Sequence, residues 1–376
     1  MRNIEIGIVG GGQLGMLLLQ SAIPFPVHVS VYDPDPTCPA GAFTKRFYQG
    51  AFEDREAILT FAKHCDVVLY ETEKTNLEAL YELQGQGKRV FSHPDSLEWI
   101  QDKGVQRQKL KDAGFPIPAF SLVPADQVRS YSGPFPIVQK ARTGGYDGQG
   151  VFIHRDAASL AKAPEMASVF EAMVSIEKEI SLLVARNEAG EIVVYPPIEM
   201  VFDQRANLVD YLVSPARIDP SLTRELTDLA QQMAHELGFV GVYAIETFVD
   251  QQGKIWINEI APRPHNSGHH TVSANVTSQY EQQIRIALGL PMGSVDLLSP
   301  CVMLNLLGAE GESGPTNYEG LEAAYRIPQV QYVFYGKSEV RPFRKMGHAI
   351  IMDPDRDTAL ARMEEIRRTL TILPHE

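Results

Sequence analysis

Cysteine, positive charge and long apolar runs are all scarce in this sequence. Its three cysteines, Cys38, Cys65 and Cys301, are far apart and show no metal-binding spacing, which favours a reducing cytoplasm. The net charge of −13 argues against a nucleic-acid-binding surface. No apolar run approaches the roughly 18 residues that a membrane span needs, and the chain enters a predicted strand at once, without the apolar segment of a signal peptide. We therefore expect a cytoplasmic protein that binds neither nucleic acid nor membrane.

The chain of 376 residues is long enough for two or three domains, and its first part alternates strand and helix patterns. A buried strand at 4–9 is followed by Gly10 to Gly15, a G-x-G-x-x-G loop, and the next strand ends at Asp33. This arrangement is typical of dinucleotide-binding domains, but the same loop also serves βαβ domains that bind another ligand or only pack. The alternation predicts a parallel doubly wound sheet ending near residue 95. Glu71 and Glu73 follow a strand at its carboxyl end, where they could meet a ligand or cap a helix.

A second glycine-rich loop lies between two predicted strands further along the chain. Residues 141–150 read ARTGGYDGQG, and Lys140 directly precedes them. Such loops bring backbone N–H groups to phosphates and can close as lids. The loop is not a Walker loop, because it lacks G-K-[ST] and no helix follows it; a long hairpin turn is the alternative. We expect Lys140 to meet the same phosphates as the loop.

The rest of the chain is predicted to be mixed at first and β-rich at its end. A helix rich in Lys and Arg spans 102–113, and the central part is predicted to contain antiparallel strands at 168–174, 179–186, 192–195, 198–202 and 208–214, with helices at 222–237 and 277–288. After Pro300, short β-like runs at 301–306, 323–326 and 348–352 precede a helix at 357–370. This change of composition predicts a small third domain.

Residues 244–270 carry the strongest chemical signal. Two short strands are expected here around a Gln251-Gln252-Gly253 turn, with Glu246 in the first and Glu259 in the second. Alternation along a strand puts Glu259 on one face with Ile255 and Ile257, where a carboxylate needs a positive partner. Two carboxylates on paired strands could hold one or two Mg²⁺ ions. A pair of edge glutamates facing solvent is the alternative.

The segment after the second carboxylate favours the metal site. Arg263, His265, Asn266 and Ser267 follow it at once, and the neighbouring prolines at 262 and 264 stiffen the segment. A rigid loop with a guanidinium, an imidazole, an amide and a hydroxyl indicates an anionic substrate beside a metal-bound nucleotide.

In their order along the chain, these features resemble the ATP-grasp carboxylate–amine ligases, and within them the N5-carboxyaminoimidazole ribonucleotide synthetases of purine synthesis. The segments that carry the resemblance are GGGQLGM (10–16), GGYDGQG (144–150), EKEISLLVARN (177–187), NEIAPRPHNSGHH (258–270) and RKMGH (344–348), of which the last two are the most specific. The resemblance implies an α/β protein, α+β in its centre. Its parts would be a Rossmann-like parallel-sheet domain at 1–98, an ATP-grasp domain of two α+β subdomains at 99–298 with a lid at about 114–175, and a small β-rich domain at 299–376.

The resemblance also assigns roles to individual positions, with ATP and two Mg²⁺ ions as cofactors and a homodimer as the assembly. The nucleotide positions are Lys103, Lys140, Gly145, Tyr146, Asp147, Gly148, Gln149, Gly150, Val151, Glu171, Val174, Glu179, Phe202, Asn258 and Glu259. The metal ligands are Glu246 and Glu259. The substrate positions are Gly12, Gln13, Leu14, Glu73, Asn266, Ser267, Lys337 and Arg344, the last two as a phosphate clamp. The catalytic candidates are Arg263, His265, Asp147 and Tyr146.

Three positions depart from the family pattern. Met16 stands where an arginine usually follows GGGQLG, and Phe202 replaces a residue that is often polar near the nucleotide. Ala261 stands where ATP-grasp proteins more widely place an asparagine, so only two carboxylates would meet the metals. Water and phosphate oxygens would then complete the metal shell.

The implied reaction is the ATP-dependent carboxylation of 5-aminoimidazole ribonucleotide (AIR) by bicarbonate, through carboxyphosphate. Arg263 would hold the bicarbonate oxygens, His265 would handle a proton, and the lid around Tyr146 would exclude water. Another ATP-grasp ligase, such as formate-dependent glycinamide ribonucleotide transformylase, would share the nucleotide site. An NAD-dependent oxidoreductase fits the first glycine loop but leaves Lys140 and both metal glutamates without a role. The intact set of Lys, Glu and Arg argues against a catalytically silent nucleotide-binding module.

Overall fold

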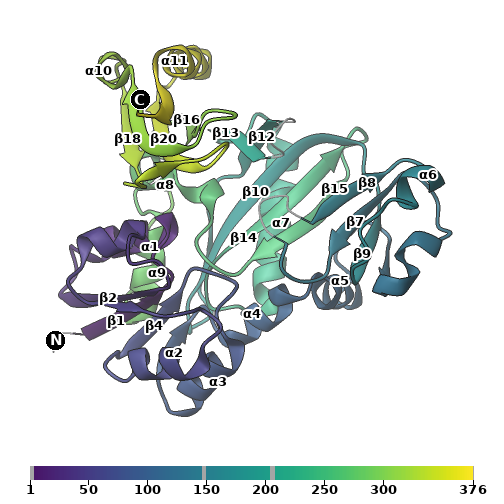
Figure 1. Cartoon of the computed structure of the whole chain (residues 1–376), viewed down its shortest axis with the longest axis horizontal. Coiled ribbons are helices and arrows are strands. Elements are labelled where there is room, and N and C mark those ends of the chain that lie inside the picture. The colour runs from purple at the N-terminus through teal and green to yellow at the C-terminus, as the bar shows by residue number, and fades with distance from the viewer. Residues whose placement is uncertain (1–3, 146–149, 204–207, 376) are drawn as a thin grey trace.

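The computed structural model describes residues 4–145, 150–203 and 208–375. The N-terminal part is a five-stranded sheet in which every strand pair is parallel, in the order β3-β2-β1-β4-β5 (Figure 1). Its elements are β1 (Ile4–Val9), α1 (Gln13–Ala22), β2 (Val27–Asp33), the 3-10 helix η1 (Pro39–Phe43), β3 (Phe47–Gln49), α2 (Arg55–Ala62), β4 (Val67–Tyr70), α3 (Leu77–Gly85), β5 (Arg89–Phe91) and α4 (Pro94–Gln101). The predicted parallel, doubly wound sheet is confirmed.

Both faces of this sheet are covered, as its apolar strands require. Ile6 and Ile8 of β1 pack with α1 on one face. Val9 and Val68 pack on the other face with Phe61 and Leu80, which come from α2 and α3. The carboxyl ends of the strands therefore form one edge, and the glycine loop after β1 and the acidic residues after β4 meet there.

A small antiparallel sheet follows, in the order β6-β9-β7-β8. Its elements, after the connecting helix α5 (Lys103–Asp112), are β6 (Phe120–Val123), η2 (Ala125–Ser130), β7 (Ile137–Ala141), β8 (Val151–His154), α6 (Ala157–Leu160) and β9 (Ser168–Ala172). Figure 1 shows this sheet beyond one end of the long central strands, on the side away from the C-terminal region.

The central sheet has nine strands, eight of them in the order β15-β14-β10-β12-β13-β16-β20-β18, while β11 pairs with β10. Its first part comprises β10 (Ile176–Arg186), β11 (Ile192–Val194), β12 (Ile198–Asp203), β13 (Leu208–Ser214), α7 (Pro220–Leu237), β14 (Gly241–Asp250), β15 (Ile255–Ala261), η3 (Asn266–Gly268), α8 (Thr271–Ala274) and α9 (Gln279–Leu288). The C-terminal elements are β16 (Cys301–Leu307), β17 (Gly314–Glu319), α10 (Leu321–Ala324), β18 (Val330–Phe334), β19 (Glu339–Val340), β20 (Lys345–Met352), α11 (Arg356–Thr369) and β21 (Thr371–Pro374).

Three C-terminal strands, β16, β20 and β18, continue the central sheet, because β13 pairs with β16 from Tyr211/Leu304 to Ser214/Cys301. The other three form a separate sheet in the order β19-β17-β21. The predicted domain limits at 98 and 298 stay predictions. One prediction for this region is wrong: residues 323–326 were expected to be β-like, but α10 covers Leu321–Ala324. Leucine, glutamate and alanine favour a helix when no sheet partner is at hand. Among the described residues, no helix combines the length and apolar character that a membrane crossing would need.

The helices on the central sheet follow their apolar periodicity. In α7, Leu226, Ala230, Met233 and Ala234 recur at helical spacing, and all four are buried against the sheet. Asp219 caps the first turn by accepting the N–H groups of residues 221 and 222. Helix α9 lies differently: its Ile284 and Ala287 pack into the core of the N-terminal sheet, so this helix joins the two large sheets.

Candidate active site

The predicted hairpin is present as β14 and β15, with both glutamates on paired strands. Gly253 at its turn has φ 78°, and its N–H donates to the Asp250 carbonyl at 2.8 Å. Glu246 and Glu259 lie directly opposite one another in the register. The structure therefore brings the two predicted metal ligands together.

The predicted face of Glu259 is wrong, because a β-bulge interrupts the strand. The register shifts between the Glu246/Glu259 pair and the Thr247/Ile257 pair, which leaves Asn258 as the extra residue. Ile257 and Ile260 consequently reach the same core, and Glu259 points to the other side. The bulge thus keeps both carboxylates of the hairpin on the face away from α7.

The two carboxylates have opposite electrostatic surroundings. Burial, Glu259 and Glu179 together raise the pKa of Glu246 to about 7. Burial acts on Glu259 in the same direction, but the Lys103 ammonium, 2.5 Å from its Oε1, outweighs it and the pKa of Glu259 is lowered. Burial also raises the pKa of Glu179 to about 7, with Lys140 acting in the opposite sense. Negative charge is therefore in excess on the Glu246 side.

This excess charge suits a divalent cation. Mg²⁺ binds one or two protein carboxylates and takes its other oxygens from water and phosphates. Among the described residues, no group of three or more His, Cys, Asp or Glu side chains could hold a metal. The residues present fit a Mg²⁺ that arrives with a nucleotide, and do not fit a metal held by protein ligands alone.

Beside the carboxylates, the cations Arg107 and Lys140 contact Glu171 and Asn258, and a third cation, Lys103, pairs with Glu259. The Glu171 carboxylate pairs with Arg107 Nε at 2.5 Å and with Lys140 Nζ at 2.9 Å. Although burial acts to raise it, these two cations lower the pKa of Glu171 to about 2. Lys140 also donates to Asn258 Oδ1 at 2.8 Å, and Lys103 pairs with Glu259, the next residue along β15. The positive charge that an anionic ligand requires in this acidic protein is concentrated here.

Arg107 is a member of this cluster that the sequence reasoning missed. It is buried, and besides Glu171 it donates to the Asn258 carbonyl. Its Nη1 is buried without a partner among the described residues. The helix that carries it was recognised only as rich in Lys and Arg. The spacing of four residues from Lys103 could have identified it, because such residues share one face of a helix.

The structure describes only some of the other predicted nucleotide positions. Tyr146, Asp147, Gly148 and Gln149 lie outside the described residues. Gly150 has φ 80° and accepts the N–H of Ala141, while Val151 opens β8 opposite Lys140. Gly145 lies in the loop before the gap, and Val174 lies in the turn between β9 and β10. Phe202 packs against an apolar cluster and stays a predicted nucleotide contact.

The loop after β15 turns its polar side chains toward the carboxylates. Arg263 Nη2 pairs with Glu73 Oε1 at 3.2 Å, which joins this loop to the end of β4. His265 Nε2 lies 3.5 Å from Glu246 Oε1, and its Nδ1 accepts the N–H of Ser267 at 3.3 Å. Ser267 Oγ lies 2.9 Å from the same Nδ1.

The same loop is held by one buried hydroxyl contact and contains two buried polar atoms without a partner among the described residues. Ser181, which the sequence reasoning did not single out, holds Ser267 through a buried contact of 2.7 Å between the two hydroxyls. The Nε of Arg263 and the Oδ1 of Asn266 are buried without a partner among the described residues. Buried polar atoms normally have hydrogen-bond partners, so these two are candidates for contact with a polar ligand.

The predicted phosphate clamp lies where the C-terminal strands meet the first glycine loop. Lys337 Nζ donates to the Lys345 carbonyl at 2.6 Å and to Gln13 Oε1 at 3.4 Å. Arg344 donates to the Glu339 carbonyl at 2.7 Å, and burial lowers its pKa, with Asp35 among the groups acting in the opposite sense. Gly12 caps α1, whereas Leu14 is buried in the core, so a ligand could meet only its backbone.

Family models match the chain in three consecutive pieces. A ribonucleotide synthetase preATP-grasp domain matches residues 3–101, an ATP-grasp domain matches 108–280, and a phosphoribosylaminoimidazole carboxylase C-terminal domain matches 301–362. The N5-carboxyaminoimidazole ribonucleotide synthase of Bacillus subtilis (strain 168) is 34% identical over 359 residues, which cover 94% of this chain and 92% of that protein. The chain belongs to the N5-carboxyaminoimidazole ribonucleotide synthase family.

Solved structures of this synthase family share the fold over nearly the whole chain. The N5-carboxyaminoimidazole ribonucleotide synthetase of Thermotoga maritima is 41% identical with a TM-score of 0.90, over 99% of this chain and 100% of that one. The synthase of Aspergillus clavatus in complex with ADP and AIR is 26% identical with a TM-score of 0.86, over 98% of each chain. The resemblance predicted from the sequence motifs is confirmed.

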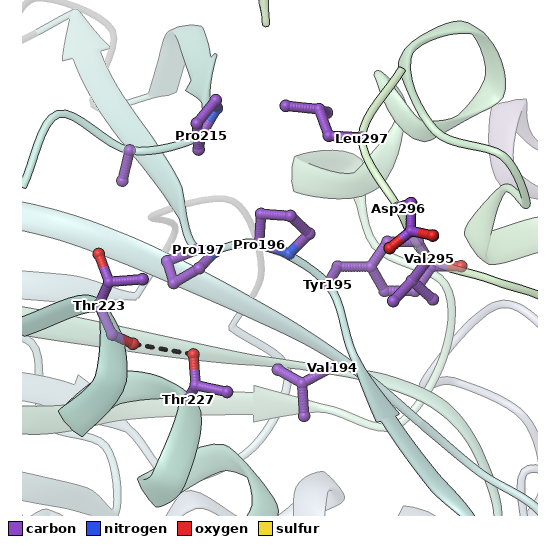
Figure 2. Close-up of a pocket in the computed structure, with 11 residues that line it drawn as sticks. Val194, Tyr195, Pro196, Pro197, Pro215, Thr223, Thr227, Val295, Asp296 and Leu297 are labelled. Atoms are coloured by element: carbon purple, nitrogen blue, oxygen red, sulfur yellow. Dashed lines mark hydrogen bonds between the residues drawn. The ribbon is translucent and has the colours of Figure 1, made fainter. Parts of the chain in front are cut away.

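A cavity elsewhere on this synthase is separate from the predicted site. It measures about 310 Å³, and no predicted site residue lines it (Figure 2). Its walls are prolines, the Thr223–Thr227 turn of α7 and the segment around Asp296, with Tyr195 on one side. The Tyr195 hydroxyl donates to the Thr277 carbonyl, so the polar groups of this cavity serve the fold.

Proposed function

We propose that the protein catalyses the ATP-dependent carboxylation of AIR with bicarbonate, yielding N5-carboxyaminoimidazole ribonucleotide, ADP and phosphate, as a step of purine biosynthesis. The observation that carries the proposal is one continuous set of contacts. It begins at Lys140 and Arg107, two cations of the kind that bind phosphates, which both donate to Asn258. From Asn258 it continues to Glu246 and then to His265. A nucleotide site and a rigid oxyanion loop are thereby adjacent.

Positioning and neutralisation of charge would carry most of the catalysis. Phosphorylation of bicarbonate gives it a leaving group, and phosphoryl transfer requires little covalent work from a protein. Arg263 is the group that would hold the bicarbonate oxygens, because a planar guanidinium fits a planar oxyanion. The salt bridge to Glu73 fixes the direction of the Arg263 guanidinium. We place the amine end of AIR close to this pair.

His265 is the proposed group for proton handling near AIR. The Ser267 N–H donates to Nδ1, so in the neutral ring the proton sits on Nε2, the nitrogen that faces Glu246. Ser181 holds the Ser267 hydroxyl in turn. These contacts would keep the imidazole in one orientation between the carboxylates and the substrate.

Mg²⁺ is proposed as the metal, with two ions bound through Glu246 and Glu259 together with nucleotide phosphates. When bound, the ions supply charge neutralisation at the phosphate oxygens. The protein's own contribution is to hold two carboxylates opposite one another at a β-bulge. Lys103, which pairs with Glu259 here, is the residue beside the carboxylates that would meet a nucleotide phosphate.

A homodimer in the cytoplasm is proposed as the working form. The family resemblance supports the dimer. The three cysteines are free and buried, which fits a reducing compartment.

The test is the release of ADP, measured with and without AIR and with and without bicarbonate. Release that needs Mg²⁺ and rises sharply when both substrates are present is the expected result. Glycinamide ribonucleotide with formate serves as the matched alternative pair. Turnover with that pair but not with AIR would assign the protein to a different ATP-grasp reaction, and NAD reduction without ADP release would sink the ligase assignment.

A further inference from the structure

The N–H groups of the first glycine loop are already occupied by carboxylates of the chain itself. Gly11 N–H donates to Asp33 Oδ2 at 2.6 Å, and Gly12 N–H donates to Glu71 Oε1 at 3.0 Å. In a dinucleotide-binding protein, the N–H groups of such a loop face a pyrophosphate. Here two internal anions take that position.

The missing side chains of the loop leave room for Glu71. A Cβ added to Gly10 would lie 2.5 Å from Glu71 Cγ, and one added to Gly12 would lie 2.9 Å from its Oε1. Gly10 has φ 108°, which by itself favours glycine, but Gly12 has an ordinary φ of −64°. At Gly12, therefore, the contact with Glu71 and not the backbone conformation accounts for the glycine.

Charged groups from three parts of the chain face this carboxylate. Burial raises its pKa to about 7, and Asp33 acts in the same direction, while Arg263 and Lys337 act in the opposite one. Arg263 comes from the loop after β15 and Lys337 from the C-terminal region. Glu71 thus interacts electrostatically with both the cation proposed for bicarbonate and a cation proposed for the substrate phosphate.

The loop residue next to Gly12 connects Glu71 to that second cation. Gln13 Oε1 accepts a hydrogen bond from Lys337 Nζ at 3.4 Å. Glu71 fixes Gly12, and Gly12 fixes where Gln13 begins α1. A displacement of the carboxylate would therefore move the partner of Lys337.

We propose that Glu71 is a positioning residue, a built-in anion that fills the pyrophosphate place of the glycine loop and holds the loop against Lys337 for the sugar-phosphate substrate. The same carboxylate excludes dinucleotides and free oxyanions from the loop. The second half of the inference rests on the proposed placement of AIR, and the first half does not.

The test compares Glu71→Ala and Glu71→Gln in the full-length protein. Without the carboxylate, the Gly12 N–H loses its acceptor, and the positive charges of Arg263 and Lys337 would favour an external oxyanion at that place. We expect sodium sulfate, at ionic strength balanced with sodium chloride, to raise the melting temperature of Glu71→Ala more than that of the wild type, whose response measures the general stabilising effect of sulfate. Glu71→Gln keeps the volume and an acceptor oxygen, so it should respond to sulfate no more than the wild type does. Glu78→Ala, which removes an exposed carboxylate from the same part of the chain, controls for the change in net charge.

Kinetics supply the second readout. A hydrogen bond to a charged acceptor corresponds to about ten- to a hundredfold in an equilibrium constant. The KM for AIR should rise by about that factor in Glu71→Ala, with the KM for ATP little changed, and Glu71→Gln should recover most of the loss. Gly12→Ala, which crowds Oε1 without straining φ, should raise the KM for AIR in the same direction even where Glu71→Ala does not fold.

Two results would overturn the proposal. One is a Glu71→Ala protein that gains no more stability from sulfate than the wild type does. The other is an unchanged KM for AIR in both Glu71→Ala and Gly12→Ala. Because the sulfate measurement needs no turnover, its outcome is independent of whether the proposed reaction is correct, which the wild-type ADP release decides separately.

Discussion

Replacing Glu246 by glutamine should stabilise the protein in the absence of metal and nucleotide. The glutamate faces Glu259 across the hairpin, and burial and its acidic neighbours raise its pKa to about 7 from a usual 4.5. Each pKa unit corresponds to about 1.4 kcal/mol, so the carboxylate form is penalised by at most about 3.5 kcal/mol. Since the side chain is 21% exposed, solvent screens part of this, and we expect a gain of about 1–2 kcal/mol at pH 8.

The sign of the pH dependence follows from the raised pKa. The folded state binds a proton at Glu246 that the unfolded state does not bind between about pH 7 and 4.5, so the wild type recovers stability as the pH falls through this range. Glutamine has no such proton. The advantage of Glu246→Gln should therefore be largest at pH 8 and should shrink toward pH 5.

Urea denaturation of the ligand-free proteins at pH 8 and pH 5 measures this difference. Glu225→Gln, a substitution of an exposed glutamate on α7, is the matched control and should change neither value. The same Glu246→Gln protein should lose turnover and the additional stability that Mg²⁺ with ATP confers on the wild type. A variant that is less stable than the wild type at pH 8, or whose advantage does not depend on pH, would refute the electrostatic reasoning.

Three further predictions follow from neighbouring contacts. Glu259→Gln should abolish turnover but, unlike Glu246→Gln, should destabilise the ligand-free protein by about 0.5–1 kcal/mol in urea denaturation, because Lys103 loses an anionic partner that is 34% exposed and partly screened by solvent; a gain in stability would contradict this. Lys337→Ala and Arg344→Ala should weaken the apparent affinity for AIR about ten- to a hundredfold and leave ATP unaffected, and the opposite pattern in initial-rate kinetics would exclude the clamp. His348 is buried and its pKa is lowered to about 3, so the folded state does not bind the proton that the unfolded state binds below about pH 6.5. Between pH 7 and 5.5 the free energy of unfolding of the wild type should therefore fall by about 1 kcal/mol relative to that of His348→Gln. Parallel pH profiles of the two proteins would contradict this.

Helices and strands were predicted correctly from the sequence where a single local pattern determines them. The parallel N-terminal sheet follows from alternating apolar strands and helices, and the hairpin around Gly253 follows from its turn residues. The face of Glu259 could not be predicted by alternation, because a bulge at Asn258 depends on the partner strand. Likewise, residues 323–326 show no periodicity long enough to separate a short helix from a strand.

The site was predictable in its chemical types but not in its pairings. Motifs indicated Lys140, Glu171 and Glu246, yet only the fold shows that Arg107 completes the Glu171 ion pair. The ligand of the first glycine loop, which precedes the strand ending at Asp33, could not be predicted for the same reason. The sequence cannot tell whether glycine N–H groups face a ligand or a carboxylate from another strand, and here they face carboxylates.

The continuous central sheet constrains how this enzyme can move and diverge. The strands that carry Glu246 and Glu259 belong to the same sheet as β18 and β20, which lie beside Lys337 and Arg344 in the chain, whereas Lys140 and Glu171 belong to a separate small sheet. The strands beside the proposed metal ligands and the strands beside the proposed phosphate clamp therefore cannot slide past one another without breaking main-chain hydrogen bonds of this sheet. The small sheet shares no strand pairing with the central one among the described residues, so Lys140 and Glu171 could move relative to Glu246, or change position in another lineage, while the central sheet stays intact.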